Sequence, residues 1–132
     1  MNLSKNFSLK EMLATSTGVV NIPTDQEIEK MKLLAEKILQ PVRDYMGIPI
    51  RINSGFRSAQ VNAAVGGSKT SQHCKGEAAD LNAGNRTLNK KMYEFIRDNL
   101  EYDQLINEYN YTWVHVSYTV CKPNRKQQLI IK

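Results

Sequence analysis

The spacing of apolar residues predicts two helices in the first third of the chain. Ser8-Leu9-Lys10-Glu11 has the pattern of a capping box and predicts a short helix that ends near Thr15. A second capping box, Thr24-Asp25-Gln26-Glu27, begins a long amphipathic helix that ends at Gly47. The apolar positions of this longer helix are Ile28, Met31, Leu34, Ala35, Ile38, Leu39, Val42, Tyr45 and Met46.

One proline and two further segments complete the helical pattern. Pro41 lies inside the long helix, so we expect a kink near residues 37–38 or a break into two helices. Ser58 is a suitable cap for a short helix over residues 59–65. A further amphipathic helix is expected to begin near Thr87, with its inward side chains at Leu88, Met92, Phe95, Ile96 and Leu100.

Alternation of apolar and polar residues predicts strands in other parts of the chain. These strands span residues 48–54, 104 to 107 or 108, 113–118 and 127–131. No internal repeat or low-complexity segment is present. The chain beyond the last predicted helix is therefore mainly strand.

Length and charge limit the classes of protein to which the chain can belong. It has 132 residues, the size of one domain with one hydrophobic core, so we treat residues 1–132 as a single domain and expect a monomer. A formal net charge of +5 and a pI of about 9.2 suit an anionic partner such as wall polymer, membrane headgroup or nucleic acid. The basic residues are dispersed and no nucleic-acid recognition motif is visible, so nucleic acid is the least favoured of these partners.

The cysteines and the N-terminus indicate a protein made in a reducing compartment. Cys74 and Cys121 do not have the spacing of metal ligands, and two cysteines are too few for a disulfide framework. We expect both as free thiols. Residues 1–7 lack the apolar core of a secretion signal, and no transmembrane segment is expected. Synthesis in the cytoplasm without a signal peptide follows as the expectation.

Two separate stretches carry candidate metal ligands. In residues 71–80 a histidine, His73, and an aspartate, Asp80, lie seven positions apart, on a loop and on the short strand that follows it. The other histidine of the chain, His115, lies in an alternating apolar strand. Two imidazole nitrogens and one carboxylate oxygen leave a fourth coordination position open for water, as a catalytic zinc site requires. The sequence therefore predicts a zinc hydrolase with one Zn²⁺ per chain.

The predicted hairpin near the C-terminus supplies a candidate general base. If residues 109–112 form its loop, Glu108 lies opposite Trp113 on the antiparallel strands. Two-residue alternation then places His115 on the same face, as a diagonal neighbour of Glu108. A carboxylate in this position can accept a proton from the attacking water and give it to the leaving amine. A loop one residue longer or shorter would turn Glu108 to the other face.

The candidate residues lie within motifs that resemble those of a known family. In order, these motifs are Ser54-Gly55-Phe56-Arg57-Ser58 with Asn62 following, Ser71-x-His73-x-x-Gly76-x-Ala78-x-Asp80, and Trp113-Val114-His115-Val116-Ser117. Over residues 50–118 the chain resembles the M15 metallopeptidases. That family includes D-alanyl-D-alanine carboxypeptidases, dipeptidases and phage L-alanyl-D-glutamate endolysins, and its fold is similar to that of the hedgehog signalling domain.

The resemblance implies an α+β fold with a small antiparallel sheet and helices packed on one side. It implies zinc on His73, Asp80 and His115, and hydrolysis of a peptide bond in peptidoglycan stem peptides at the bacterial cell wall. Arg57 matches the family arginine that pairs with a substrate carboxylate, a task that suits its planar guanidinium. Ser71 matches a serine that contacts substrate or braces the loop. A phage-derived enzyme released by lysis is one route to the wall.

One position departs from the pattern of many family members. They place an acid three residues before the last histidine, where this chain has Thr112, which cannot act as a base. Glu108 matches instead the arrangement of the hedgehog-like and some phage-type members. Glu77 is a rival acid within the motif, and we interpret it as a surface residue. Cys74 adjoins a ligand, but neighbours on an extended segment point in opposite directions, so we assign it to packing.

Alternative functions remain open at this point. A metal-containing binding module without turnover, as in the hedgehog-like case, would keep the three ligands and tolerate loss of Glu108. Carboxypeptidase, dipeptidase and endopeptidase members share these motifs, so the motifs do not identify the bond that is cut. The aromatic residues of the last strands either line a substrate cleft or belong to the core. These residues are Trp113, Tyr109, Tyr111 and Tyr118.

Overall fold

A computed structural model describes residues 1–132 as a mixed α+β fold in which helices precede and interrupt the strands of a central sheet. The helical elements are α1 (Leu9–Leu13), α2 (Asp25–Leu34), η1 (Ala35–Leu39), α3 (Gln40–Met46), α4 (Ala59–Ala64), η2 (Gln72–Lys75) and α5 (Arg86–Asn99). The strands are β1 (Asn2–Ser4), β2 (Phe7–Ser8), β3 (Arg51–Ser54), β4 (Ala78–Asn82), β5 (Gln104–Glu108), β6 (Trp113–Ser117) and β7 (Gln127–Ile131).

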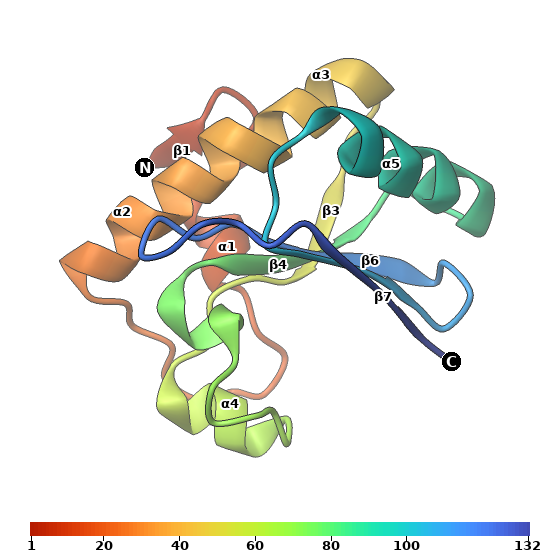
Figure 1. Cartoon of the computed structure of the whole chain (residues 1–132). Helices are drawn as coiled ribbons and strands as arrows, with labels where there is room; N and C mark the ends of the chain where they lie inside the picture. The colour runs from red at the N-terminus through yellow and green to blue at the C-terminus, as the bar shows by residue number, and fades with distance from the viewer.

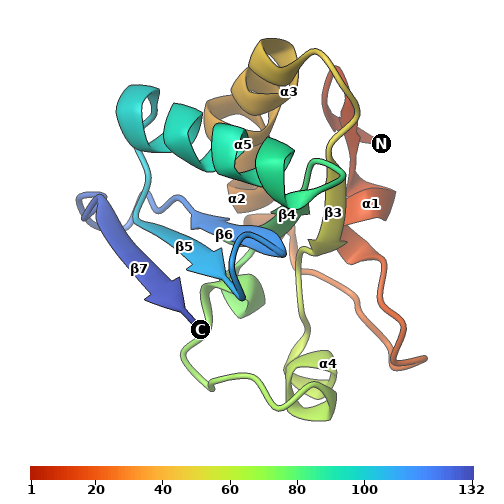
Figure 2. The ribbon, with the colours of Figure 1, turned by 90° about the vertical axis from the view of Figure 1, so that its right-hand side faces the viewer.

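The main sheet has five strands in the order β3-β4-β6-β5-β7, and β1 pairs with β2 in a separate small hairpin. The expected antiparallel pairing is confirmed for β3, β4, β6 and β5. It is wrong for β7, which pairs with β5 in parallel (Figure 2). The reason is the path of the segment after β6, which returns to the start of β5. There the N–H groups of Lys126 and Gln127 donate to the carbonyls of Tyr102 and Asp103.

Helices α2, α3 and α5 lie on one side of the sheet, and the short α4 lies on the other (Figures 1 and 2). The expectation of helices packed on one side is confirmed for the longer helices. Their apolar faces and one face of the sheet form the core, because side chains alternate along each strand. Its fully buried members include Met31, Leu34, Ile38, Leu39, Val42, Leu81, Met92, Ile96, Leu105, Val114 and Val116. The opposite face of the sheet is left for polar groups.

The long helix of the first third is divided at the position that Pro41 predicts. A π-helical turn, η1, separates α2 from α3, and the N–H of Gln40 donates to the carbonyl of Ala35. This wider turn accommodates a proline in the first turn of α3, where its missing N–H costs little. Gly47 ends the helix in the left-handed conformation, with φ of +67°. Figure 1 shows the resulting nearly continuous rod above the sheet. No helix of the chain is both long and apolar enough to cross a membrane.

Three helix boundaries differ from the predicted ones. Helix α4 ends at Ala64 rather than at Val65. Helix α1 ends at Leu13 rather than near Thr15. Helix α5 is capped by Asn85 rather than near Thr87, because the Asn85 side chain accepts a hydrogen bond from the N–H of Leu88 at 2.8 Å. Asparagine is the better N-cap of the two residue types, so the helix begins earlier than its apolar pattern suggests.

Candidate metal centre

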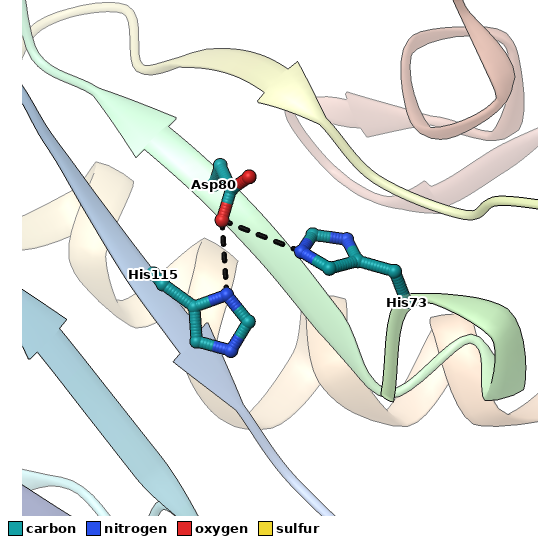
Figure 3. A group of neighbouring side chains, drawn as sticks. All are labelled: His73, Asp80 and His115. Carbon is teal, nitrogen blue, oxygen red and sulfur yellow. Dashed lines mark hydrogen bonds and ion pairs between the residues drawn. The ribbon is translucent and has the colours of Figure 1, made fainter. Parts of the chain in front are cut away.

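The pairing of β4 with β6 places two of the predicted ligands side by side. Asp80 lies in the middle of β4, directly opposite His115 of β6 in the antiparallel register. Both side chains therefore point to the face of the sheet that the long helices leave open. The Nδ1 atom of His115 lies 2.9 Å from Oδ1 of Asp80 (Figure 3).

The third predicted ligand, His73, reaches the same point from the single turn η2. The Oγ atom of Ser71 accepts a hydrogen bond from the His73 N–H at 3.2 Å and so begins the turn. Gly76 ends it in the left-handed conformation, with φ of +74°. The Nδ1 atom of His73 lies 2.7 Å from the carbonyl oxygen of Gly55. This contact turns Nε2 toward Asp80, 3.4 Å from its Oδ1 (Figure 3).

The three side chains have the chemistry of a zinc site. Their ligand atoms all lie within 4.8 Å of one another. A carbonyl can only accept, so the Gly55 carbonyl requires the proton on Nδ1 of His73 and leaves the Nε2 lone pair for a metal. The side chains of His73, Asp80 and His115 are only 4%, 11% and 12% exposed. Two imidazole nitrogens and one carboxylate oxygen, held in a shielded position, fit Zn²⁺.

Electrostatics keep the shared carboxylate ionised. Burial by itself would raise the pKa of Asp80, but hydrogen bonds with His115 and His73 hold the pKa of this carboxyl well below its usual range. A carboxylate must be deprotonated to bind a metal. The cluster therefore offers its oxygen ligand in the required form.

Arg57 lies beside this cluster, as the sequence motif suggests. Its Nη2 is 3.7 Å from Oδ2 of Asp80, and its Nε donates to the Ser54 hydroxyl at 3.1 Å. The Arg57 backbone N–H also donates to the carbonyl of His73. These contacts fix a guanidinium next to the candidate metal ligands, where it can meet a carboxylate of a ligand.

Glu108 has the position that the hairpin register predicts. It lies opposite Trp113, and Ile106 lies opposite His115, so Glu108 and His115 share the open face of the sheet. The Trp113 indole N–H donates to Oε2 of Glu108 at 2.8 Å. Burial and the negative charge of Asp80 raise the pKa of Glu108, and the Trp113 hydrogen bond offsets part of this effect. The arrangement provides a carboxylate that accepts protons more readily than a solvated one.

Two other residues of the ligand motif differ from their predicted environments. Cys74 lies in the helical turn η2 rather than on an extended segment, and its thiol is not part of the metal-ligand group. Burial raises the pKa of the Cys74 thiol, which favours the protonated form. Glu77 is not a surface residue, because only 4% of it is exposed. Its carboxylate accepts a hydrogen bond from the Thr119 hydroxyl at 3.0 Å and lies 3.7 Å from Nζ of Lys30.

Asp103 is a buried acid that the sequence interpretation missed. Its carboxylate accepts hydrogen bonds from Nε and Nη2 of Arg125 at 2.9 and 2.8 Å, and from Nε2 of Gln72 at 3.1 Å. The same Gln72 amide lies 3.4 Å from Oε1 of Glu77. Gln72 precedes His73, so this network holds the turn that carries one candidate ligand. The signal available in the sequence is the place of Asp103 directly before the apolar strand that begins at Gln104.

Comparisons with known proteins agree with this geometry. The family model described as Peptidase M15 matches residues 3–117, a range that contains all three candidate ligands, Arg57 and Glu108. The chain is also 51% identical over 49 residues to a zinc D-Ala-D-Ala carboxypeptidase of Streptomyces albus G. The aligned stretch covers 36% of this chain and 19% of the carboxypeptidase. The chain thus matches about a fifth of the length of that relative.

Proposed function

The chain belongs to the peptidase M15 family of zinc metallopeptidases, and from this premise we propose that it hydrolyses a peptide bond in the stem peptides of peptidoglycan. The observation that carries the proposal is the convergence of His73, Asp80 and His115, whose ligand atoms lie within 4.8 Å of one another. We propose one zinc ion per chain at these residues. The relative from Streptomyces albus G, a D-Ala-D-Ala carboxypeptidase by name, supports a wall peptide as the substrate.

Glu108 is the proposed general base. Zinc, when bound, supplies a Lewis acid that polarises the scissile carbonyl and activates the attacking water. Glu108 accepts the proton that this water loses and transfers it to the nitrogen of the leaving amine. The Trp113 N–H orients one oxygen of this carboxylate and leaves the other free for the proton. Burial of Glu108 and its position near Asp80 raise its proton affinity, which favours the first transfer.

Arg57 is the proposed anchor for a substrate carboxylate. Its guanidinium is fixed beside Asp80 by the Ser54 hydroxyl and stays within reach of a peptide that lies over the cluster. Ser71 is proposed to brace the turn of His73 through its hydrogen bond and to contact substrate. A terminal carboxylate on Arg57 corresponds to carboxypeptidase action, and an internal one to endolysin-type endopeptidase action. The proposed place of action is the bacterial cell wall.

Hydrolysis of purified peptidoglycan by the zinc-loaded protein tests the proposal. Mass spectrometry of the released muropeptides identifies the bond that is cut, and Glu108→Gln is compared with the wild type. We expect cleavage by the wild type and a fall in kcat of about 100-fold or more for the variant. Equal activity of the two proteins would show that Glu108 is not the base. Stoichiometric zinc without cleavage of peptidoglycan or stem peptides would favour the binding-module alternative.

A further inference from the structure

A groove of about 780 Å³ lies next to His115 on the open face of the sheet. Ile106 and His115 form its floor, Ser71 and the turn η2 line one side, and the segment after β6 forms the opposite wall. This volume is within the range of sites for small molecules and short peptides. A substrate bound at the three candidate metal ligands therefore has room to continue into the groove.

The lining of the groove carries an excess of positive charge. Two of its cations are compensated: Lys30 lies 3.7 Å from Glu77, and Arg125 pairs with the buried Asp103 at 2.8 Å. The other two cations of the lining, Lys75 and Lys122, make no ion pair and are exposed. The groove next to His115 is therefore lined by two lysines whose charge no carboxylate compensates.

The wall formed by the segment after β6 lies outside the residues that the family model matches, but hydrogen bonds hold it in place. The family match ends at residue 117, whereas residues 118–126 form this wall. Asp103 accepts hydrogen bonds from the backbone N–H and the guanidinium of Arg125, and also from the amide of Gln72. The wall is therefore tied to the turn of His73 by a buried carboxylate. Such support gives its cations a defined position.

We propose that this groove binds an anionic stretch of the peptide substrate through Lys75 and Lys122. The inference rests on the proposed function, because the occupant must be continuous with a peptide held at the metal cluster. Arg57 does not line the groove and lies at Oδ2 of Asp80, so the groove is a second site for carboxylates. Stem peptides that keep their side carboxylates free are the preferred substrates, and amidated ones are poorer.

Two synthetic stem pentapeptides test this specificity. One carries free carboxylates on D-glutamate and diaminopimelate, and the other carries the corresponding amides. The double variant Lys75→Gln/Lys122→Gln is compared with Lys37→Gln/Lys90→Gln, whose exposed lysines lie on η1 and α5 and make no ion pair. Each pair of substitutions lowers the formal net charge from +5 to +3. Values of kcat/KM are measured with the zinc-loaded proteins, and Kd is measured by calorimetry on the zinc-loaded Glu108→Gln background.

We expect the groove variant to lose about tenfold of the preference for the acidic peptide, in KM and Kd rather than in kcat. The control variant should keep the wild-type preference. An equal preference in all three proteins, or an equal loss in both variants, overturns the inference. If no protein cleaves either peptide, the proposed function fails, and the Kd ratios still decide whether the groove selects carboxylates. Tighter binding of a polyphosphate than of the acidic peptide, with a steep salt dependence, also overturns it.

Discussion

At the scale of single residues, the Trp113 indole N–H is the one hydrogen-bond donor that orients Glu108, at 2.8 Å. Trp113→Phe removes this donor and keeps an aromatic ring on the strand. We expect kcat on a stem peptide to fall about tenfold with little change in KM, because the hydrogen bond positions the base rather than the substrate. Steady-state kinetics measure both constants.

Tyr109→Phe is the matched control for this substitution. Its ring lies 5.1 Å from that of Trp113, between centroids, and no hydrogen bond joins it to Glu108. This variant should keep the wild-type kcat. A wild-type kcat for Trp113→Phe would mean that Glu108 does not need this hydrogen bond for its role.

His115 tests the metal centre itself. His115→Ala removes one of three ligands, and we expect zinc affinity to fall by more than about 100-fold, since loss of a mere supporting contact to a ligand costs 10–100-fold. Metal analysis after dialysis should find one zinc per chain in the wild type and much less in the variant. Glu108→Gln, which alters no candidate ligand, should keep one zinc per chain. Retention of stoichiometric zinc by His115→Ala would rule out this ligand set.

The sequence predicted the candidate ligands better than their surroundings. His73, Asp80 and His115 were recognised because few residue types bind zinc and their motifs occur in order. The burial of Glu77 was not predictable in the same way. Its hydrogen-bond partner Thr119 lies 42 residues away, and nothing local indicates that the two meet. Charged side chains are expected at the surface unless such partners are known.

At the scale of elements, signals within a few residues of each other were reliable. Both predicted capping boxes, at Ser8 and Thr24, form in the structure. The hairpin loop over residues 109–112 has the predicted length, so the predicted register of Glu108 is confirmed. The parallel pairing of β7 was missed because it depends on where the preceding segment packs. Strand order beyond a hairpin is a non-local property that alternation alone does not contain.

The turn η2 gives a prediction at this scale. Gly76 ends it with φ of +74°, and a Cβ there would lie 2.6 Å from the carbonyl oxygen of Glu27 in α2. Gly76→Ala combines the left-handed penalty of about 1–2 kcal/mol with this steric overlap, so we expect a larger loss in the free energy of unfolding. The shift of the turn should also weaken zinc binding through His73. Urea denaturation and zinc titration measure the two effects.

Gly47→Ala separates backbone strain from displacement of the ligand. Gly47 has φ of +67°, but its Cβ position has no neighbour within 4 Å. This variant should lose only the left-handed penalty of about 1–2 kcal/mol in the free energy of unfolding and keep wild-type zinc affinity. If Gly76→Ala also binds zinc as the wild type does, the turn does not depend on Gly76 to position His73.

At the scale of the whole molecule, the fold divides its sheet between stability and chemistry. One face supports the core beneath α2, α3 and α5, and the other presents the three candidate metal ligands, Arg57 and Glu108. Asp103 connects the C-terminal segment to the turn that carries His73. It stands at the start of β5 and joins Arg125, before β7, to Gln72 in η2. The stability of the C-terminal segment therefore depends on one buried charge.

This dependence predicts how stability varies with pH. Hydrogen bonds from Arg125 lower the pKa of Asp103 from 3.8 to about 2, although burial opposes the shift. Because the folded-state pKa lies below the unfolded one, the stabilisation is complete above about pH 4 and is lost as pH falls toward 2. Because Arg125 is half-exposed, we expect this ionised pair to contribute about 1–2 kcal/mol to the free energy of unfolding.

Asp103→Asn tests this dependence. The substitution should lower the free energy of unfolding at pH 7, and the difference between variant and wild type should shrink below pH 4. Asp98→Asn, at a solvent-exposed pair with Arg97, should show a much smaller pH-dependent difference, because water screens that pair. A difference for Asp103→Asn that stays constant between pH 2 and 7 would mean that packing, not charge, makes Asp103 important.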